Sequence, residues 1–174
     1  MQQKGIKIVI GLVMIMALGG FAWLMTPPVG YNNGYQPKQP IPYDHSLHAG
    51  KYQIQCQYCH SNVEFSKHSS VPSLNVCLNC HNQIKTDSPH IQRIREAHDS
   101  GESIEWVKIH MLPDFVHFNH KRHVRKGVSC QTCHGPIEEM VEVYQYSDLS
   151  MGWCINCHRK PENNAPVTCS TCHY

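Results

Sequence analysis

The chain has 174 residues, which is enough for one compact domain and a targeting segment. It contains 10 cysteines and 14 histidines, so it is rich in metal-ligating side chains for its size. The formal net charge is only +2, and no run of Lys and Arg is longer than two residues, so the composition argues against a nucleic-acid-binding surface.

An apolar segment lies near the start of the chain. Ile8 to Met25 has no charged residue, and at a helical rise of about 1.5 Å per residue it is long enough to cross a bilayer once. Lys4 and Lys7 precede it, which predicts a cytoplasmic N-terminus and a domain on the periplasmic side. We expect residues 1–28 to be a retained, single-pass anchor in a bacterial inner membrane. The alternative is a cleaved signal peptide.

A segment without hydrophobic periodicity follows the anchor. Residues 29–42 are rich in Gly, Asn, Tyr and Pro, which is typical of an extended linker. The ligand-rich domain is then expected to cover residues 43–174.

Five Cys-x-x-Cys-His boxes use all of the cysteines. Such a box is typical of c-type haem attachment, because its thiols bond the haem and the adjacent histidine takes the iron. Zinc sites and disulfides also use paired cysteines, but neither requires a histidine in the next position. The boxes therefore predict five covalently attached haem c groups. The attachment residues are Cys56, Cys59, Cys77, Cys80, Cys130, Cys133, Cys154, Cys157, Cys169 and Cys172, and the proximal iron ligands are His60, His81, His134, His158 and His173.

A second motif precedes two of the boxes. The sequence YDHSLH at 43–48 stands before Cys56 much as FNHKRH at 118–123 stands before Cys130. Each copy has the pattern aromatic-x-His-x-x-His, so each supplies two histidines beyond its box. A haem held from one side still needs a second axial ligand, and these histidines are the natural candidates.

This combination of motif and box resembles the class III multihaem cytochromes c. In that group the first histidine of the pair ligates the haem of the following box, and the second ligates a neighbouring haem. The resemblance implies that His45 and His120 complete the irons of their own boxes. It implies in the same way that His48 and His123 reach irons attached at other boxes.

Five haems need a fifth distal ligand. His110 is our first choice, because the alternation over 104–110 predicts an extended segment with Trp106 on the same side. Met140 and Met151 compete with it, since His/Met ligation raises haem potential. Core packing is the alternative explanation for all three. Further candidates are His68, His117, and His90 and His98, which lie in a helix expected between the N-cap Ser88 and the stop at Gly101.

The expected fold follows from the scarcity of periodic segments. Ordinary apolar burial cannot fill a domain with so few of them. We expect a class III-like multihaem cytochrome c fold, with short helices and loops wrapped around five haems, little β-structure and one N-terminal transmembrane helix. The haem-free domain should then be unfolded.

Iron atoms with two protein ligands leave no free site for a substrate. The sequence therefore indicates an electron-transfer protein rather than an enzyme. A multihaem reductase would need one five-coordinate haem, and no box departs from the common pattern. A membrane-anchored quinol dehydrogenase of the NapC/NrfH type is another alternative. Its first box is followed by x-Met, whereas His60 is followed by Ser61 and Asn62.

Longer segments between the boxes carry a more specific resemblance. They are QPIPYDHSLHAGKYQIQCQYCHSNVEFS, WVKIHMLPDFVHFNHKRH and CHGPIEEMVEVYQYSDLSMGWCINCHR. These segments resemble the pentahaem, membrane-anchored cytochrome subunit of bacterial alternative complex III. The resemblance implies an electron-transfer subunit of a quinol:electron acceptor oxidoreductase. It implies polytopic quinol-binding membrane subunits, a periplasmic iron–sulfur subunit, and a monohaem cytochrome c or terminal oxidase as partners.

Overall fold

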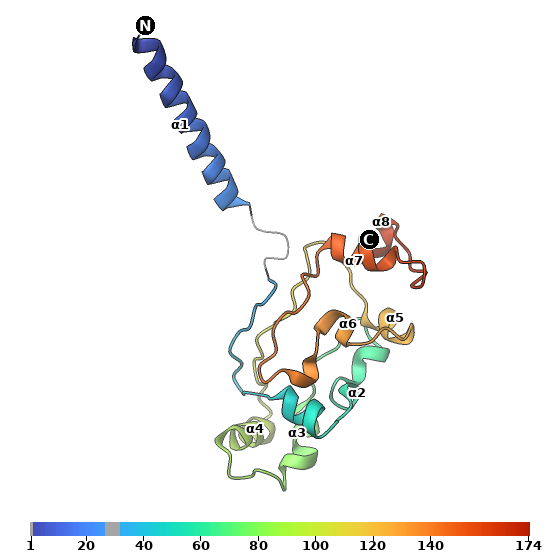
Figure 1. The fold of residues 1–174 in the computed structure, drawn as a ribbon. Helices are drawn as coiled ribbons and strands as arrows, with labels where there is room; N and C mark the ends of the chain where they lie inside the picture. The colour runs from blue at the N-terminus through green and yellow to red at the C-terminus, as the bar shows by residue number, and fades with distance from the viewer. Residues whose placement is uncertain (1, 27–31) are drawn as a thin grey trace. The chain divides into compact units, whose positions relative to one another are not determined.

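The computed structural model describes residues 2–26 and 32–174, and the chain divides into two compact units, Met1–Tyr31 and Asn32–Tyr174. The first unit is the helix α1 (Gln2–Met25), drawn in blue in Figure 1. Its segment Gly5–Met25 has a mean hydropathy of 2.4 and is not buried, so α1 is long and apolar enough to cross a membrane. A signal sequence has the same properties. Residues 27–31, from the ends of the predicted anchor and linker, lie outside the described residues.

The second unit consists of short helices joined by loops, and no strand occurs in residues 32–174 (Figure 1). The expected fold of short helices and loops is therefore confirmed. The helical elements after α1 are η1 (Ser46–Lys51), α2 (Cys56–Cys59), η2 (Ser61–Glu64), α3 (Leu74–His81), α4 (Pro89–Ser100), α5 (His120–Arg125), α6 (Gln131–His134), η3 (Ile137–Glu139), α7 (Met151–His158) and α8 (Cys169–Cys172).

Helix α4 follows the signals that predicted it. Ser88 has an extended backbone at the N-cap, Pro89 occupies the first turn, and Gly101 ends the helix with a φ of 73°. Proline suits the first turn because its missing N–H has no partner there, and glycine adopts the left-handed conformation without strain. The helix predicted between Ser88 and Gly101 is therefore confirmed.

One apolar cluster joins α4 to α3. Ile91 and Ile94 of α4 pack with Leu78 of α3 and with Ile41. Trp106, which we expected on the same side as His110, packs against this cluster. Buried apolar side chains are few for a domain of this length, as expected if cofactors fill its interior. Those that the structure describes are Ile41, Leu78, Ile91, Ile94, Ala97, Met140 and Leu149.

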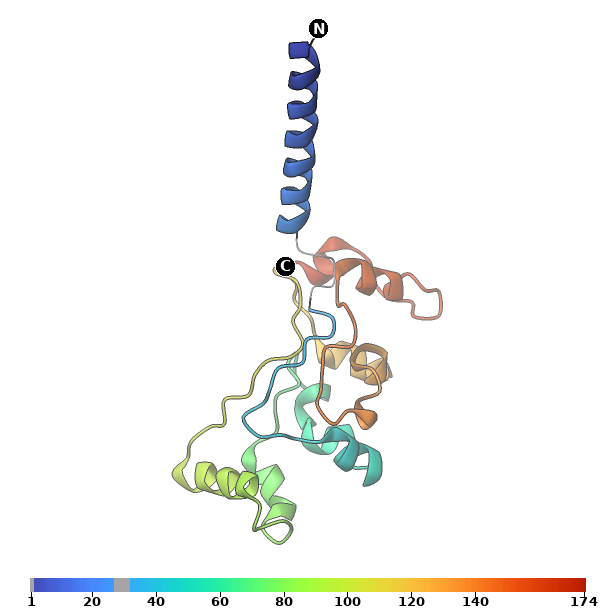
Figure 2. The same ribbon diagram turned by 60° about the vertical axis from the view of Figure 1, so that its left-hand side comes forward.

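Extended segments run beside the short helices. Residues 32–42, which include most of the predicted linker, and residues 102–116 lie side by side in Figures 1 and 2. The side-chain amide of Gln39 joins them, because it donates to the Val107 carbonyl and accepts from the Val107 amide, each at 2.9 Å. The chain from Asn32 onward therefore belongs to the compact second unit.

A buried glutamine connects three of these segments. The side chain of Gln145 is 0% exposed. Its Nε2 donates to the Ser147 carbonyl at 3.1 Å, and its Oε1 accepts from the Met111 amide at 2.9 Å. Its backbone carbonyl accepts from the Gly34 amide at 2.8 Å. Gln145 thus satisfies buried backbone groups that have no helix or sheet to pair with.

Replacement of Gln145 by leucine should lower the free energy of unfolding by about 2–4 kcal/mol, because it leaves a buried N–H and a buried C=O unpaired. Chemical denaturation of the haem-loaded protein, followed by circular dichroism, measures this loss. Gln36→Leu is the matched control, since the Gln36 amide donates to the Glu142 carbonyl at an exposed position. Equal losses from both variants would show that Gln145 has no special role.

Candidate functional site

Each Cys-x-x-Cys-His box lies on a short helix. Boxes 1, 3 and 5 include the single-turn helices α2, α6 and α8, and boxes 2 and 4 end the longer helices α3 and α7. Residues three apart in a helix share one face, so each pair of thiols points the same way and the histidine follows directly. All ten cysteines are free thiols. This arrangement suits attachment of one group through two neighbouring sulfur atoms.

Histidine rings face one another across several of the boxes. Two metal–nitrogen bonds of about 2 Å each, plus the distances from Nε2 to the ring centres, separate two imidazoles on one metal ion by about 6 Å. The described residues include no group of three or more His, Cys, Asp or Glu side chains that could hold a metal ion by themselves. Three pairs have the required centroid separation: His48 and His81 at 6.2 Å, His120 and His134 at 6.4 Å, and His123 and His158 at 6.0 Å.

These pairs agree with the roles that the class III resemblance implied. His120 faces the histidine of its own box, and His123 faces the histidine of box 4. In the first copy, His48 faces the histidine of box 2. His45 is half-buried, and burial lowers its pKa to about 4, with the nearby His60 of box 1 as the next cause. His45 is therefore neutral at pH 7, as an iron ligand must be.

The second ring nitrogen of these histidines is occupied. A histidine that ligates a metal through Nε2 almost always donates its Nδ1–H to an oxygen, which fixes the orientation of the ring. The structure has this bond in both box and motif histidines, at distances of 2.7–3.0 Å. Backbone carbonyls accept from seven of them: Asp44 from His48, Ser70 from His60, Ile84 from His81, Lys67 from His120, Asn119 from His123, Pro166 from His158, and Phe115 from His173.

Two of the nine predicted histidine ligands differ from this pattern. His45 Nδ1 is buried and has no hydrogen-bond partner. His134 Nδ1 lies 3.1 Å from Nε2 of His110, a side chain rather than a backbone carbonyl. His110 therefore lies beside box 3, and this contact does not fit its predicted role as the fifth distal ligand.

The other candidates for that ligand lie in different surroundings. Both ring nitrogens of His98 have polar partners, Asp99 at 3.0 Å and Asn75 at 2.7 Å, which fits the packing explanation. His117 lies at box 5, where its amide donates to the Cys172 carbonyl and its ring stacks on Tyr174.

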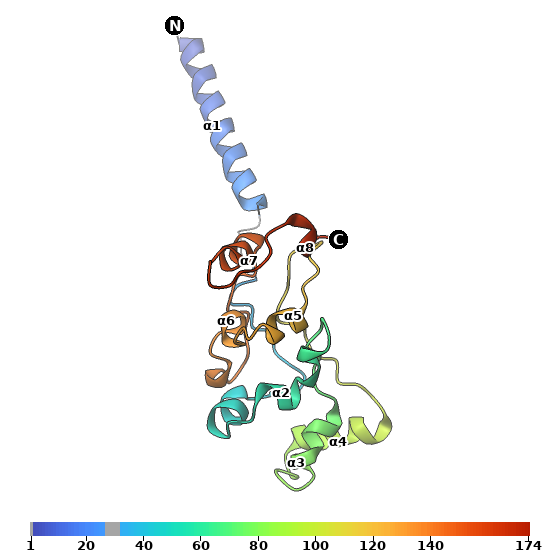
Figure 3. The same cartoon turned by 90° about the vertical axis from the view of Figure 1, so that its right-hand side faces the viewer.

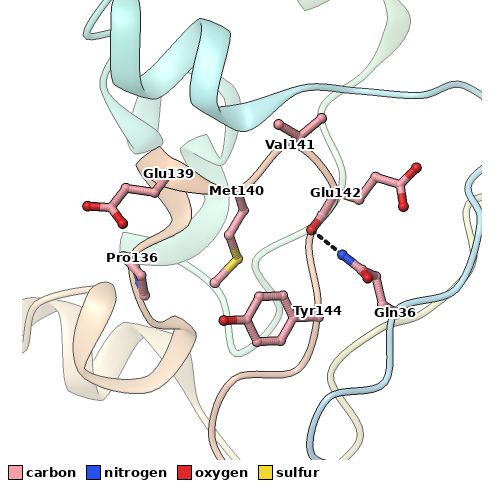
Figure 4. Close-up of a pocket in the computed structure, with 7 residues that line it drawn as sticks. All are labelled: Gln36, Pro136, Glu139, Met140, Val141, Glu142 and Tyr144. Carbon is pink, nitrogen blue, oxygen red and sulfur yellow. Dashed lines mark hydrogen bonds between the residues drawn. The ribbon is translucent and has the colours of Figure 1, made fainter.

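The two methionines differ in exposure. Met140 is 5% exposed and lines a hollow of about 450 Å³ with Gln36 and Tyr144 (Figure 4). Met151 is 66% exposed and begins α7, the helix of box 4. The side chain of Met140 is therefore packed in the interior, whereas that of Met151 is not. The identity of the fifth distal ligand stays a prediction.

The comparison with known proteins agrees with this geometry. Residues 116–174, which hold the second motif copy and the last three boxes, match the family model described as cytochrome c7 and related cytochrome c. The chain has a cytochrome c7-like multihaem fold. This family binds haem c covalently, so the box residues and the histidine pairs fit the cofactor that the fold requires.

A curated relative extends the similarity over most of the chain. The multihaem cytochrome c subunit of menaquinone reductase from Nitratidesulfovibrio vulgaris is 27% identical over an alignment of 190 positions, which covers 94% of the present chain and 87% of that protein. The chain is therefore related to a multihaem cytochrome subunit of a quinone reductase, which agrees with the electron-transfer role expected from the sequence.

The aromatic residue of each motif copy contacts both histidines of the same copy. Tyr43 stacks on His48 at 4.4 Å and meets His45 edge-on at 4.7 Å. In the second copy, Phe118 stacks on His123 at 4.6 Å and meets His120 edge-on at 4.8 Å. One ring thus orients two imidazoles. The sequence pattern includes this aromatic residue, but spacing alone did not reveal its role.

Replacement of Tyr43 by leucine should disturb the two haems served by His45 and His48, because each lost ring contact is worth about 0.5–1.5 kcal/mol. Paramagnetic resonance of the oxidised protein should show altered signals for two low-spin irons. Tyr43→Phe is the control and should leave the spectrum unchanged, since Phe118 makes the same contacts in the other copy. If the phenylalanine variant changed as much as the leucine variant, the hydroxyl rather than the ring would matter.

Proposed function

We propose that the chain is the five-haem electron-transfer subunit of a membrane complex that exchanges electrons with quinone. The ten box cysteines attach the haems, and the five box histidines are the proximal ligands. His45, His48, His120 and His123 are the distal ligands of the first four boxes. The observation that carries this proposal is the spacing of the three histidine pairs, 6.0–6.4 Å, which fits one iron in each pair.

The attachment thiols of different boxes lie near one another, which supports a continuous row of cofactors. Burial, followed by the nearby thiols of box 4, raises the pKa of Cys133 to about 11. Burial likewise raises the pKa of Cys59, with Cys77 of box 2 as the next cause. Boxes 3 and 4 are therefore neighbours, and so are boxes 1 and 2.

Two further contacts connect these pairs of boxes. Burial raises the pKa of Cys130 of box 3, with the nearby thiol of Cys56 of box 1 as the next cause. Cys154 of box 4 lies near a thiol of box 5, Cys172. The helices α3, α2, α6, α7 and α8 follow one another in the same order in Figure 3. We therefore place the five cofactors in the order 2, 1, 3, 4, 5.

The two motif copies join neighbours in this order. The first copy joins boxes 1 and 2, and the second joins boxes 3 and 4, in each case through two histidines on one short helix. Three residues of backbone thus fix the spacing between two attached haems. Haem c bound at these sites supplies transfer of single electrons, and the protein's part is to hold neighbouring groups close together.

The curated relative supports a partner that reacts with quinone. That protein is named for menaquinone reductase, and it matches almost the whole of the present chain. We propose polytopic quinone-binding subunits in the membrane and an iron–sulfur subunit in the periplasm, as in alternative complex III. A monohaem cytochrome c or a terminal oxidase would take the electrons. Retained α1 would anchor the haem domain, residues 43–174, on the periplasmic side of the inner membrane.

Purification from native membranes in a mild detergent tests this proposal. The chain should co-purify with an iron–sulfur protein and polytopic subunits, and a pyridine haemochrome assay should find five haems in it. The complex should oxidise a quinol with cytochrome c as acceptor, or reduce a menaquinone analogue from a reduced donor, which gives the direction of flow. Recovery of a lone monomer with quinol activity would contradict the proposal and favour the NapC/NrfH-type alternative.

A further inference from the structure

The partner of His134 distinguishes box 3 from the other boxes. In boxes 1, 2, 4 and 5, the Nδ1 of the box histidine bonds to a backbone carbonyl at 2.7–3.0 Å. In box 3 the partner is Nε2 of His110 at 3.1 Å, and the two rings meet at an interplanar angle of 81° with centroids 4.4 Å apart. This side chain comes from the extended segment before α5, 24 residues from His134.

The direction of this hydrogen bond follows from ligation. If His134 binds iron through Nε2, its Nδ1 carries the proton and can only donate. Nε2 of His110 must then accept, so His110 is the tautomer protonated at Nδ1. Because its Nε2 lone pair is used in this bond, that nitrogen is not free to bind an iron.

We propose that His110 is a positioning residue for the third box, where it fixes the ring of His134 and sets the potential of the haem attached at Cys130 and Cys133. The inference rests on the proposed haem at that box. Acceptance of the Nδ1 proton makes a ligating imidazole a stronger donor to the metal, which stabilises the oxidised iron. Loss of the acceptor should therefore raise the midpoint potential of this haem.

The location of His110 means that its effect on the haem potential would influence electron transfer through the whole subunit. Box 3 stands in the middle of the proposed order 2, 1, 3, 4, 5, so each electron that crosses the subunit must pass it. In the other four boxes the acceptor is a backbone carbonyl, which no substitution can remove. At box 3 the acceptor is a side chain, so a change of one residue can adjust the middle potential and leave the attachment residues intact.

Three variants of the full-length, haem-loaded chain test this inference. His110→Leu removes the acceptor, and His110→Gln keeps an oxygen that can accept from His134. His98→Leu is the matched control, since the His98 ring bonds to Asn75 and Asp99 rather than to a box histidine. The measurements are the haem count, the paramagnetic resonance spectrum and a potentiometric titration of each purified protein.

We expect His110→Leu to keep five low-spin haems, with one midpoint potential moved upward, and His110→Gln to keep or largely restore the original value. The control should match the wild type. The inference is overturned if no potential moves in the leucine variant, or if the glutamine variant moves as far. A new high-spin iron in the leucine variant would also overturn it, because His110 would then be an axial ligand. None of these readouts depends on quinone or on partner subunits, so a failure here is distinguishable from a failure of the proposed complex.

Discussion

Replacement of His120 by alanine should remove one of five low-spin signals from the oxidised protein, and replacement of His123 should remove a different one. The reason is that His120 faces His134 of box 3, whereas His123 faces His158 of box 4. Each substitution leaves its iron with a single protein ligand, so that iron should become high-spin. Paramagnetic resonance at low temperature measures both changes.

Double variants identify which iron each histidine serves. His120→Ala combined with His134→Ala acts on one iron and should cost one low-spin signal. His123→Ala combined with His134→Ala acts on two irons and should cost two. Residues that share one site give non-additive effects, whereas independent sites add. Equal losses from the two double variants would mean that the pairs are wrongly assigned.

Removal of the haems should have the largest effect on stability. The described part of the domain buries few apolar side chains, and most of them lie in the cluster between α3 and α4. Elsewhere the interior consists of loops around the histidine pairs. Without an iron ion between the two histidines of each pair, little holds these loops together. A chain expressed without haem attachment should show little helical circular dichroism beyond that of α1, and its second unit should be digested rapidly by protease.

The cluster around Ile91 and Ile94 provides an internal control for that experiment. If any part resists digestion without haem, it should be the fragment that contains α3 and α4. A haem-free domain that resists protease throughout residues 32–174 would contradict the view that cofactors form its core.

The sequence predicted those parts of the fold that depend on local signals. Helix α4 has its cap, its proline and its terminal glycine, and these signals act within a few residues. The pairing of His120 with its own box was implied by the resemblance that the repeated pattern carries, and the separation of the two rings agrees with it. For the same reason the boxes and the motif copies could be recognised one by one from their spacing.

Contacts between distant segments could not be read in this way. The alternation over 104–110 indicated which side chains share a side but not what they contact, so the packing of Trp106 against the cluster of α3 and α4 was not predicted. The two motif copies also differ in backbone, since the first forms the π-helix η1 and the second the α-helix α5. A Cβ at Gly50 in η1 would collide with the Glu138 carbonyl, a constraint that comes from a segment far along the chain.

The Lys67 carbonyl links the two halves of the duplicated architecture. It accepts from Nδ1 of His120 at 3.0 Å and from the backbone amide of the same residue at 3.2 Å. The chain that follows box 1 therefore orients His120, the proposed distal ligand of box 3. Neither motif copy with its boxes is a self-sufficient module, and a chain cut between them would leave the second copy with a misdirected imidazole. The chain contains two similar motif copies, and the Lys67 carbonyl makes the second depend on the segment that follows box 1.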